Sequence, residues 1–188
     1  MTKNVFEIVI GRGTLKWDAV WRMIDWLADP SEGHGLKDAF RDLLAKHCLG
    51  SEFDQVEITV EYLLGNDETG KTRHPDMAIA SPSLGSPSSI ALIDDLAIRS
   101  PNNSRKIDNL VLYAKMAETK FPNARKRIVV ITDTTSTEKF TKLPRKFEEV
   151  KFVELVFLPL QTIGSWIDQL QVPKDHIVQD FAEWSLSL

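Results

Sequence analysis

Three aspartates lie in two neighbouring apolar segments of this 188-residue chain. Asp76 directly follows Pro75, and the pair Asp94 and Asp95 lies inside the run ALIDDLAI. A carboxylate in an otherwise apolar strand costs several kcal/mol unless it is paired or bound to a cation. Carboxylates that converge on one point suit a hard divalent cation, whose bound waters can attack a phosphodiester. The pattern therefore predicts a site for Mg²⁺ or Mn²⁺ and a chemistry of phosphodiester hydrolysis.

Two predicted strands, residues 75–80 and 89–98, would hold these acids, and a turn rich in Pro, Ser and Gly joins them. In the first strand, Asp76 shares a face with Ala78 and Ala80, because side chains alternate along a strand. The second strand is apolar almost throughout, which is typical of a central strand covered on both faces. The two strands would bring the acids to one end of a sheet.

An earlier strand begins at Gln55, where apolar and polar residues alternate with a period of two. Its polar face carries Glu57 and Glu61, and we expect one of them to be an accessory carboxylate ligand. A polar loop with two glycines, residues 65–71, follows and predicts a hairpin.

Helical periodicity and further apolar runs complete an α/β pattern of a single domain over residues 1–188. Residues 1–35 form an N-terminal extension with a helix that contains Trp17, Trp21 and Trp26. The core, residues 36–132, has the order α-β-β-β-α-β, with a central mixed sheet flanked by helices. The remaining predicted elements are a helix from about residue 105 to 121, strands at 127–132 and 152–159, and helices at 162–170 and 175–184.

At this point the chain resembles the PD-(D/E)XK phosphodiesterase superfamily, which has the restriction-endonuclease-like fold. The resemblance covers roughly residues 36–132: Pro75-Asp76 matches the PD motif, and ALIDDLAI falls where the family has its (D/E)XK strand. The following helix, with Asn109-Leu110 and Tyr113, is similar to the family's QLxxY helix, although Asn109 stands where the family often has Gln. The resemblance implies that Asp76 is the central metal ligand and that Asp95 or Asp94 is the second.

The family's lysine is missing from its usual place, two residues after the second acid. That position is Leu96 counted from Asp94 and Ala97 counted from Asp95, and neither side chain carries a charge. The nearest cations along the sequence are Arg99, Arg105 and Lys106. We expect Lys106, one turn into the next helix, to substitute for the lysine.

Composition excludes several other classes of protein. A formal net charge of -4 argues against a strongly basic nucleic-acid-binding surface, although a local basic face is compatible with it. One cysteine excludes a disulfide framework and a multi-cysteine zinc site. No window reaches the roughly 20 apolar residues of a membrane span, so we expect a cytoplasmic protein without a membrane partner.

Three functions remain open from the sequence. The first is a Mg²⁺-dependent or Mn²⁺-dependent nuclease, with DNA favoured over RNA as the substrate. The second is a catalytically inactive nuclease-like protein that acts as a binding or regulatory subunit in nucleic-acid processing or defence, with a second copy or another protein as its partner. The third is a small-molecule-binding α/β domain, for which the sequence has no phosphate-binding loop. The acids also have a purely structural interpretation, because Pro-Asp is a common turn dipeptide and Asp94-Asp95 could end a strand.

Overall fold

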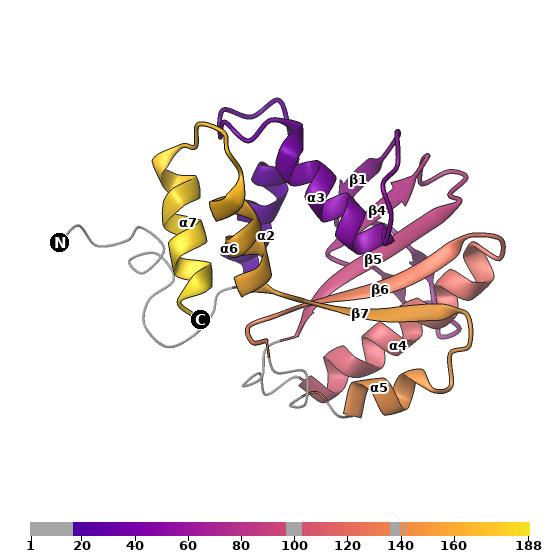
Figure 1. Cartoon of the computed structure of the whole chain (residues 1–188). Helices are drawn as coiled ribbons and strands as arrows, with labels where there is room; N and C mark the ends of the chain where they lie inside the picture. Colours follow the sequence, from indigo (N-terminus) through magenta and orange to yellow (C-terminus); the bar gives the residue numbers. More distant parts are fainter. Residues whose placement is uncertain (1–16, 97–102, 136–139, 141) are drawn as a thin grey trace.

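A five-stranded mixed sheet runs through the centre of the computed structural model, which describes residues 17–96, 103–135, 140 and 142–188. The strand order is β1-β4-β5-β6-β7 (Figure 1). The first three strands of this order pair antiparallel, and β5, β6 and β7 pair parallel. The strands are β1 (Glu57–Val60), β4 (Met77–Ser81), β5 (Ser89–Leu96), β6 (Arg125–Thr132) and β7 (Val153–Pro159). The prediction of an α/β fold with a central mixed sheet is confirmed.

Helices cover both faces of the sheet, and each face has its own apolar core. On one face lie α2 (Trp17–Ala28), α3 (Asp38–Leu49), α6 (Leu160–Gln169) and α7 (His176–Leu186), and on the other lie α4 (Asn103–Lys120) and α5 (Lys142–Phe147) (Figure 1). Strand side chains alternate between the two cores: Met77 and Ile79 pack on the α2 and α3 side, and Ala78 and Ala80 on the α4 side. This is the alternation expected for a strand buried on both faces.

The helix α4 follows the prediction closely, because its apolar side is buried against the sheet. The buried residues of this stripe are Ile107, Leu110, Val111, Ala114 and Ala117. The helix connects β5 to its parallel neighbour β6, as a crossover between parallel strands requires. Its first turn therefore lies near the carboxyl end of β5, where Asp94 and Asp95 are found.

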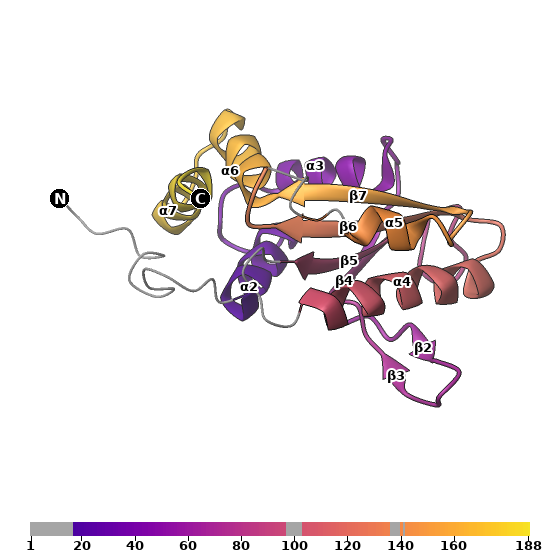
Figure 2. The same ribbon diagram turned by 90° about the horizontal axis from the view of Figure 1, so that it is seen from below.

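The predicted hairpin is present as two short strands, β2 (Gly65–Asn66) and β3 (Thr72–Arg73), which project beyond β4 and α4 (Figure 2). The strand predicted to begin at Gln55 is shorter than expected. The observed strand β1 ends at Val60, because Glu61 adopts a φ of 47°, which breaks the extended conformation. The short helix α5 was not predicted: its segment KLPRKF is mainly basic and gives no clear helical period. Residues 97 and 98 of the predicted second strand and residues 14–16 before α2 lie outside the described residues.

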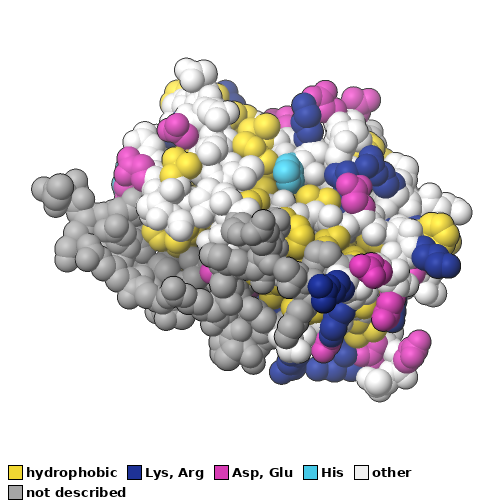
Figure 3. Space-filling view, turned by 60° about the horizontal axis from the view of Figure 1, so that its bottom comes forward, with side chains coloured by type: hydrophobic (Ala, Val, Ile, Leu, Met, Phe, Trp, Pro, Cys, Tyr) yellow, Lys and Arg dark blue, Asp and Glu magenta, His cyan; other side chains and the backbone are white. Residues whose placement is uncertain are grey.

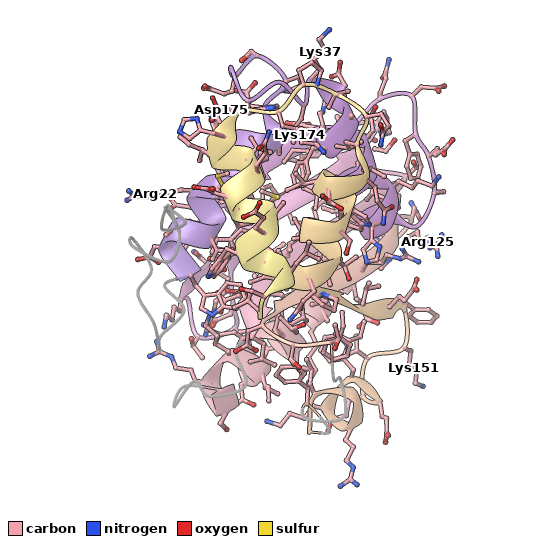
Figure 4. All side chains as sticks on the ribbon, turned by 60° about the vertical axis from the view of Figure 1, so that its left-hand side comes forward. Arg22, Lys37, Arg125, Lys151, Lys174 and Asp175 are labelled. Atoms are coloured by element: carbon pink, nitrogen blue, oxygen red, sulfur yellow. The ribbon has the colours of Figure 1, made fainter. Side chains whose placement is uncertain are left out.

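The C-terminal helix α7 starts with a capping residue. Asp175 accepts a hydrogen bond from the backbone N–H of Ile177 at 2.8 Å, and Figure 4 shows Asp175 at the first turn of this helix. Such a cap satisfies one of the free N–H groups of a helix start. In the described part of the chain, no helix combines the length and the apolar character that a membrane crossing needs.

Candidate metal centre

Asp76, Asp94 and Asp95 converge at one end of the sheet. Each offers a carboxylate oxygen, and these three oxygens lie within 4.8 Å of one another. The pairing of β4 with β5 explains the approach: Met77 is opposite Ile93, so the preceding residue, Asp76, lies beside Asp94 on the adjacent strand. The sheet register alone therefore brings the two predicted motifs together.

Asp95 joins the other two acids although strand alternation points it elsewhere. Asp94 follows the face of Leu92 and Leu96, which pack under α4, whereas Asp95 follows the face of Ile93, which packs under α2 and α3. Both acids lie at the carboxyl end of β5, where side chains from the two faces can reach around the end of the strand. The backbone N–H of Asp95 also donates to Asp94 Oδ1 at 2.7 Å, which keeps the two carboxylates close.

Lys106 provides a cation at this cluster. Its Nζ lies 2.5 Å from Asp95 Oδ1 and 3.7 Å from Asp94 Oδ1. It comes from the first turn of α4, the helix that follows β5. Leu96, two residues after Asp94, is fully buried in the core under α4. An ammonium thus stands beside the acids, although the strand position carries a leucine.

The pKa values of the cluster are shifted because several carboxylates are buried close together. Burial, followed by the charge of Asp94 and a hydrogen bond with it, raises the pKa of Asp76 to about 8. Burial also raises the pKa of Asp94. Burial alone would lower the pKa of Lys106, but its hydrogen bond to Asp95 and the charges of the acids outweigh burial and raise that pKa. Asp76 and Asp94 thus act as a coupled pair that retains a proton near neutral pH when no other cation is bound.

The helix α4 also fixes the segment that carries Asp76. The Tyr113 hydroxyl donates to the His74 carbonyl at 3.0 Å, and Arg73 Nη1 donates to Asn109 Oδ1 at 3.0 Å. Burial, then the charges of Asp94 and Asp76, raise the pKa of Tyr113, so its hydroxyl remains a donor. Two residues of α4 therefore contact the segment immediately before Asp76, Tyr113 at the backbone of His74 and Asn109 at the side chain of Arg73.

A hollow of about 420 Å³ adjoins Asp76 and is open to solvent. Its lining residues come from α2, from the end of β1 and from the start of β4: Asp18, Trp21, Arg22, Asp25, Val60, Glu61 and Asp76. Arg22 extends from α2 at the side of the molecule away from Arg125 (Figure 4). The hollow therefore carries a guanidinium together with several carboxylates, which suits a ligand that brings both phosphate and cation.

The surface charge elsewhere is mixed. On the face shown in Figure 3, Lys and Arg side chains lie among Asp and Glu side chains instead of forming one continuous basic surface. Interspersed charges of both signs give a weak net field for attracting a polyanion.

The remaining predicted residues occupy different places. The structure corrects the prediction that Glu57 could be an accessory ligand. Glu57 pairs with Ala80, about 10 Å along the strand from Val60. Its Oε2 accepts a hydrogen bond from the Leu84 N–H at 2.7 Å, so its carboxylate is not in the cluster. Glu61 lines the hollow, and its N–H donates to the Asp76 carbonyl at 2.7 Å, but its carboxylate is outside the three-acid group.

The three cations considered as substitutes for the lysine differ in their positions. Arg105 is exposed, in contrast to its neighbour Lys106, and Arg99 lies outside the described residues. The sequence interpretation missed Trp21, which donates from Nε1 to Asp95 Oδ1 at 3.4 Å. The only signal for it was the cluster of three Trp residues in one segment, which is equally typical of core packing.

The donor set fits a hard divalent cation. Three carboxylates within 4.8 Å, two of them with raised pKa values, would be relieved of mutual repulsion by a Mg²⁺ or Mn²⁺ ion. In contrast to a soft-metal site, the group contains no Cys or His. Comparisons of the chain with protein-family models, with curated proteins and with solved structures find no match.

Proposed function

We propose that this protein is a metal-dependent nuclease with a divergent restriction-endonuclease-like core, and that it hydrolyses phosphodiester bonds, with DNA favoured over RNA. The observation that carries the proposal is the convergence of Asp76, Asp94 and Asp95 with the ammonium of Lys106. These residue types, on two adjacent strands and the following helix, agree with the resemblance noted from the sequence.

The carboxylates of Asp76, Asp94 and Asp95 would hold Mg²⁺ or Mn²⁺. When bound, such an ion lowers the pKa of a water and offsets the charge that develops on the phosphate. In the metal-free protein, the hydrogen bond to Asp95 and the charges of the acids outweigh burial and raise the pKa of Lys106, so the side chain is an ammonium before an ion binds. Its role is to donate hydrogen bonds to the attacking water or to a phosphate oxygen and to stabilise negative charge there.

Arg22 is the candidate contact for the substrate backbone, because it lines the hollow beside Asp76. A guanidinium matches the geometry of a phosphate and remains charged at all relevant pH values. The neighbouring acids, Asp18 and Asp25, would oppose a phosphate that arrives without a cation. Substrate binding is therefore expected to depend on the divalent ion.

The test is cleavage by the purified protein with Mg²⁺, with Mn²⁺ and with EDTA. Substrates should include double-stranded DNA, single-stranded DNA and RNA. We expect cleavage with either ion, none with EDTA, and loss of cleavage in Asp76→Ala. Glu57→Gln is the matched control, since this acid lies on the same sheet but outside the cluster, and its activity should equal that of the wild type. Cleavage that is absent, or unchanged in Asp76→Ala, contradicts the proposal.

The second candidate is a catalytically inactive nuclease-like protein that binds a nucleic acid or a protein partner. Its specific support is Leu96, fully buried where the family has its lysine, together with the ion pair between Lys106 and Asp95, which balances one carboxylate without a metal. This candidate predicts nucleic-acid or protein binding that EDTA and Asp76→Ala leave unchanged. Metal-dependent cleavage abolished by Asp76→Ala would reject it.

A further inference from the structure

We propose that Trp21 of α2 is a positioning residue that orients the Asp95 carboxylate in the candidate metal centre. The inference rests on the proposed metal-dependent function and extends it to a helix outside the predicted core. Trp21 Nε1–H donates to Asp95 Oδ1 at 3.4 Å, a contact between residues 74 positions apart. The N···O distance is longer than the roughly 2.7–3.2 Å of most N–H···O bonds, so the bond is a weak one.

Two donors approach Asp95 from opposite faces of the sheet. Lys106 of α4 lies 2.5 Å from Oδ1, and Trp21 of α2 approaches the same oxygen. The Asp95 side chain is only 4% exposed, so water has little access to replace either donor. With Oδ1 engaged by both donors, rotation of the carboxylate is restricted.

The two donors differ in what a bound cation would do to them. The ammonium of Lys106 is repelled by a divalent ion, whereas the indole is neutral and can only donate. Trp21 can therefore keep its contact with Asp95 when a cation is present. Its ring is half-buried and packs against the core, and the helix is anchored by the fully buried Val20 and Ile24.

Outer-shell partners of this kind matter for metal affinity. Loss of a hydrogen bond that orients a ligand typically weakens metal binding by about 10–100-fold. The contact of Trp21 is long, so we place its effect at the lower limit, about tenfold. The prediction concerns binding and does not require that the protein be active.

The test compares Trp21→Phe with Trp26→Phe in the full chain, using Mn²⁺ binding followed by electron paramagnetic resonance. Trp26 is the matched control because it also donates an indole N–H to a carboxylate, Glu32 Oε2 at 3.2 Å, from the same helix but in an exposed place. We expect the Mn²⁺ Kd to rise about tenfold in Trp21→Phe and to stay unchanged in Trp26→Phe. If Trp21→Phe does not fold, the wild-type titration described next carries the test.

A second readout uses the wild type alone. The indole N–H resonance of Trp21 should shift during a Mg²⁺ titration with the same Kd as the metal site, and that of Trp26 should not. A Trp21 indole that makes no contact with Asp95 in solution would leave both resonances in place. Equal Mn²⁺ affinity in Trp21→Phe and the wild type, or a resonance that does not move, overturns the proposal for Trp21 and leaves the nuclease proposal standing. A wild type that binds no Mn²⁺ overturns both.

Discussion

Replacing Asp76 with asparagine is expected to stabilise the metal-free protein at neutral pH. Burial and the charge of Asp94 raise the pKa of Asp76 from its ordinary value of 3.8 to about 8 in the folded chain. The unfolded chain ionises this group freely near pH 4. Because the folded-state pKa is the higher one, the contribution of Asp76 to stability is most favourable below the unfolded pKa and declines as the pH rises towards 8.

The size of the effect follows from the same two pKa values. Neutral pH lies about 3 pH units above the unfolded pKa, and each unit corresponds to about 1.4 kcal/mol, so the penalty has an upper limit of about 4 kcal/mol. Relaxation and partial solvation reduce such penalties, and we expect a gain of about 2 kcal/mol, or about 4–8 °C in Tm for a chain of this size. Asparagine keeps the hydrogen bond, because its amide N–H can donate to Asp94.

Thermal unfolding followed by circular dichroism in EDTA measures this difference. The gain should shrink at about pH 5. This pH is closer to the pKa of Asp76 in the unfolded chain, so keeping the group protonated in the folded chain costs less free energy. Addition of Mn²⁺ should raise the Tm of the wild type and leave that of Asp76→Asn nearly unchanged, and Glu57→Gln should behave like the wild type in every condition. A lower Tm for Asp76→Asn in EDTA at neutral pH would refute the electrostatic reasoning.

Three further substitutions test the surroundings of the cluster. Lys106→Met should lower the free energy of unfolding by about 1–3 kcal/mol in EDTA, because it leaves Asp95 without its ammonium, and Mg²⁺ should reduce this loss in denaturant titrations. Arg22→Ala should raise KM for nucleic acid several-fold with the Mn²⁺ Kd unchanged, as steady-state kinetics and metal titration would show. Tyr113→Phe should cost about 1 kcal/mol of stability, since it removes the hydrogen bond to the His74 carbonyl; a chemical denaturation curve identical to that of the wild type would contradict this.

The sheet was largely predictable because its strands carry strong local patterns. The nearly continuous apolar runs of β4 and β5 are signals of strands buried on both faces, and both strands are buried almost throughout. The position of α2 was not predictable, because its apolar stripe says that it packs but not on which part of the sheet. The helix α5 was missed because, among its residues whose side chains are described, two are buried, Leu143 and Phe147, and two residues are too few to define a period.

The site was predictable to the extent that strand register decides it. Asp76 and Asp94 lie side by side because β4 and β5 pair as neighbours, which the short turn between them already favoured. Asp95 and Glu57 show the limit of period-two reasoning. Asp95 reaches the cluster from the other face because it lies at a strand end, and Glu57 has the right residue type but pairs too far along β1.

The place of Lys106 links the charge of the site to its occupancy. Its ammonium lies 2.5 Å from one of the carboxylates that would bind a cation and 3.7 Å from another. It therefore offsets the negative charge of the acids when no metal is bound. A divalent ion between the same carboxylates would repel the ammonium towards solvent. Because Lys106 pairs with carboxylates that would also hold the ion, the effect of Lys106→Met on stability should depend on Mg²⁺.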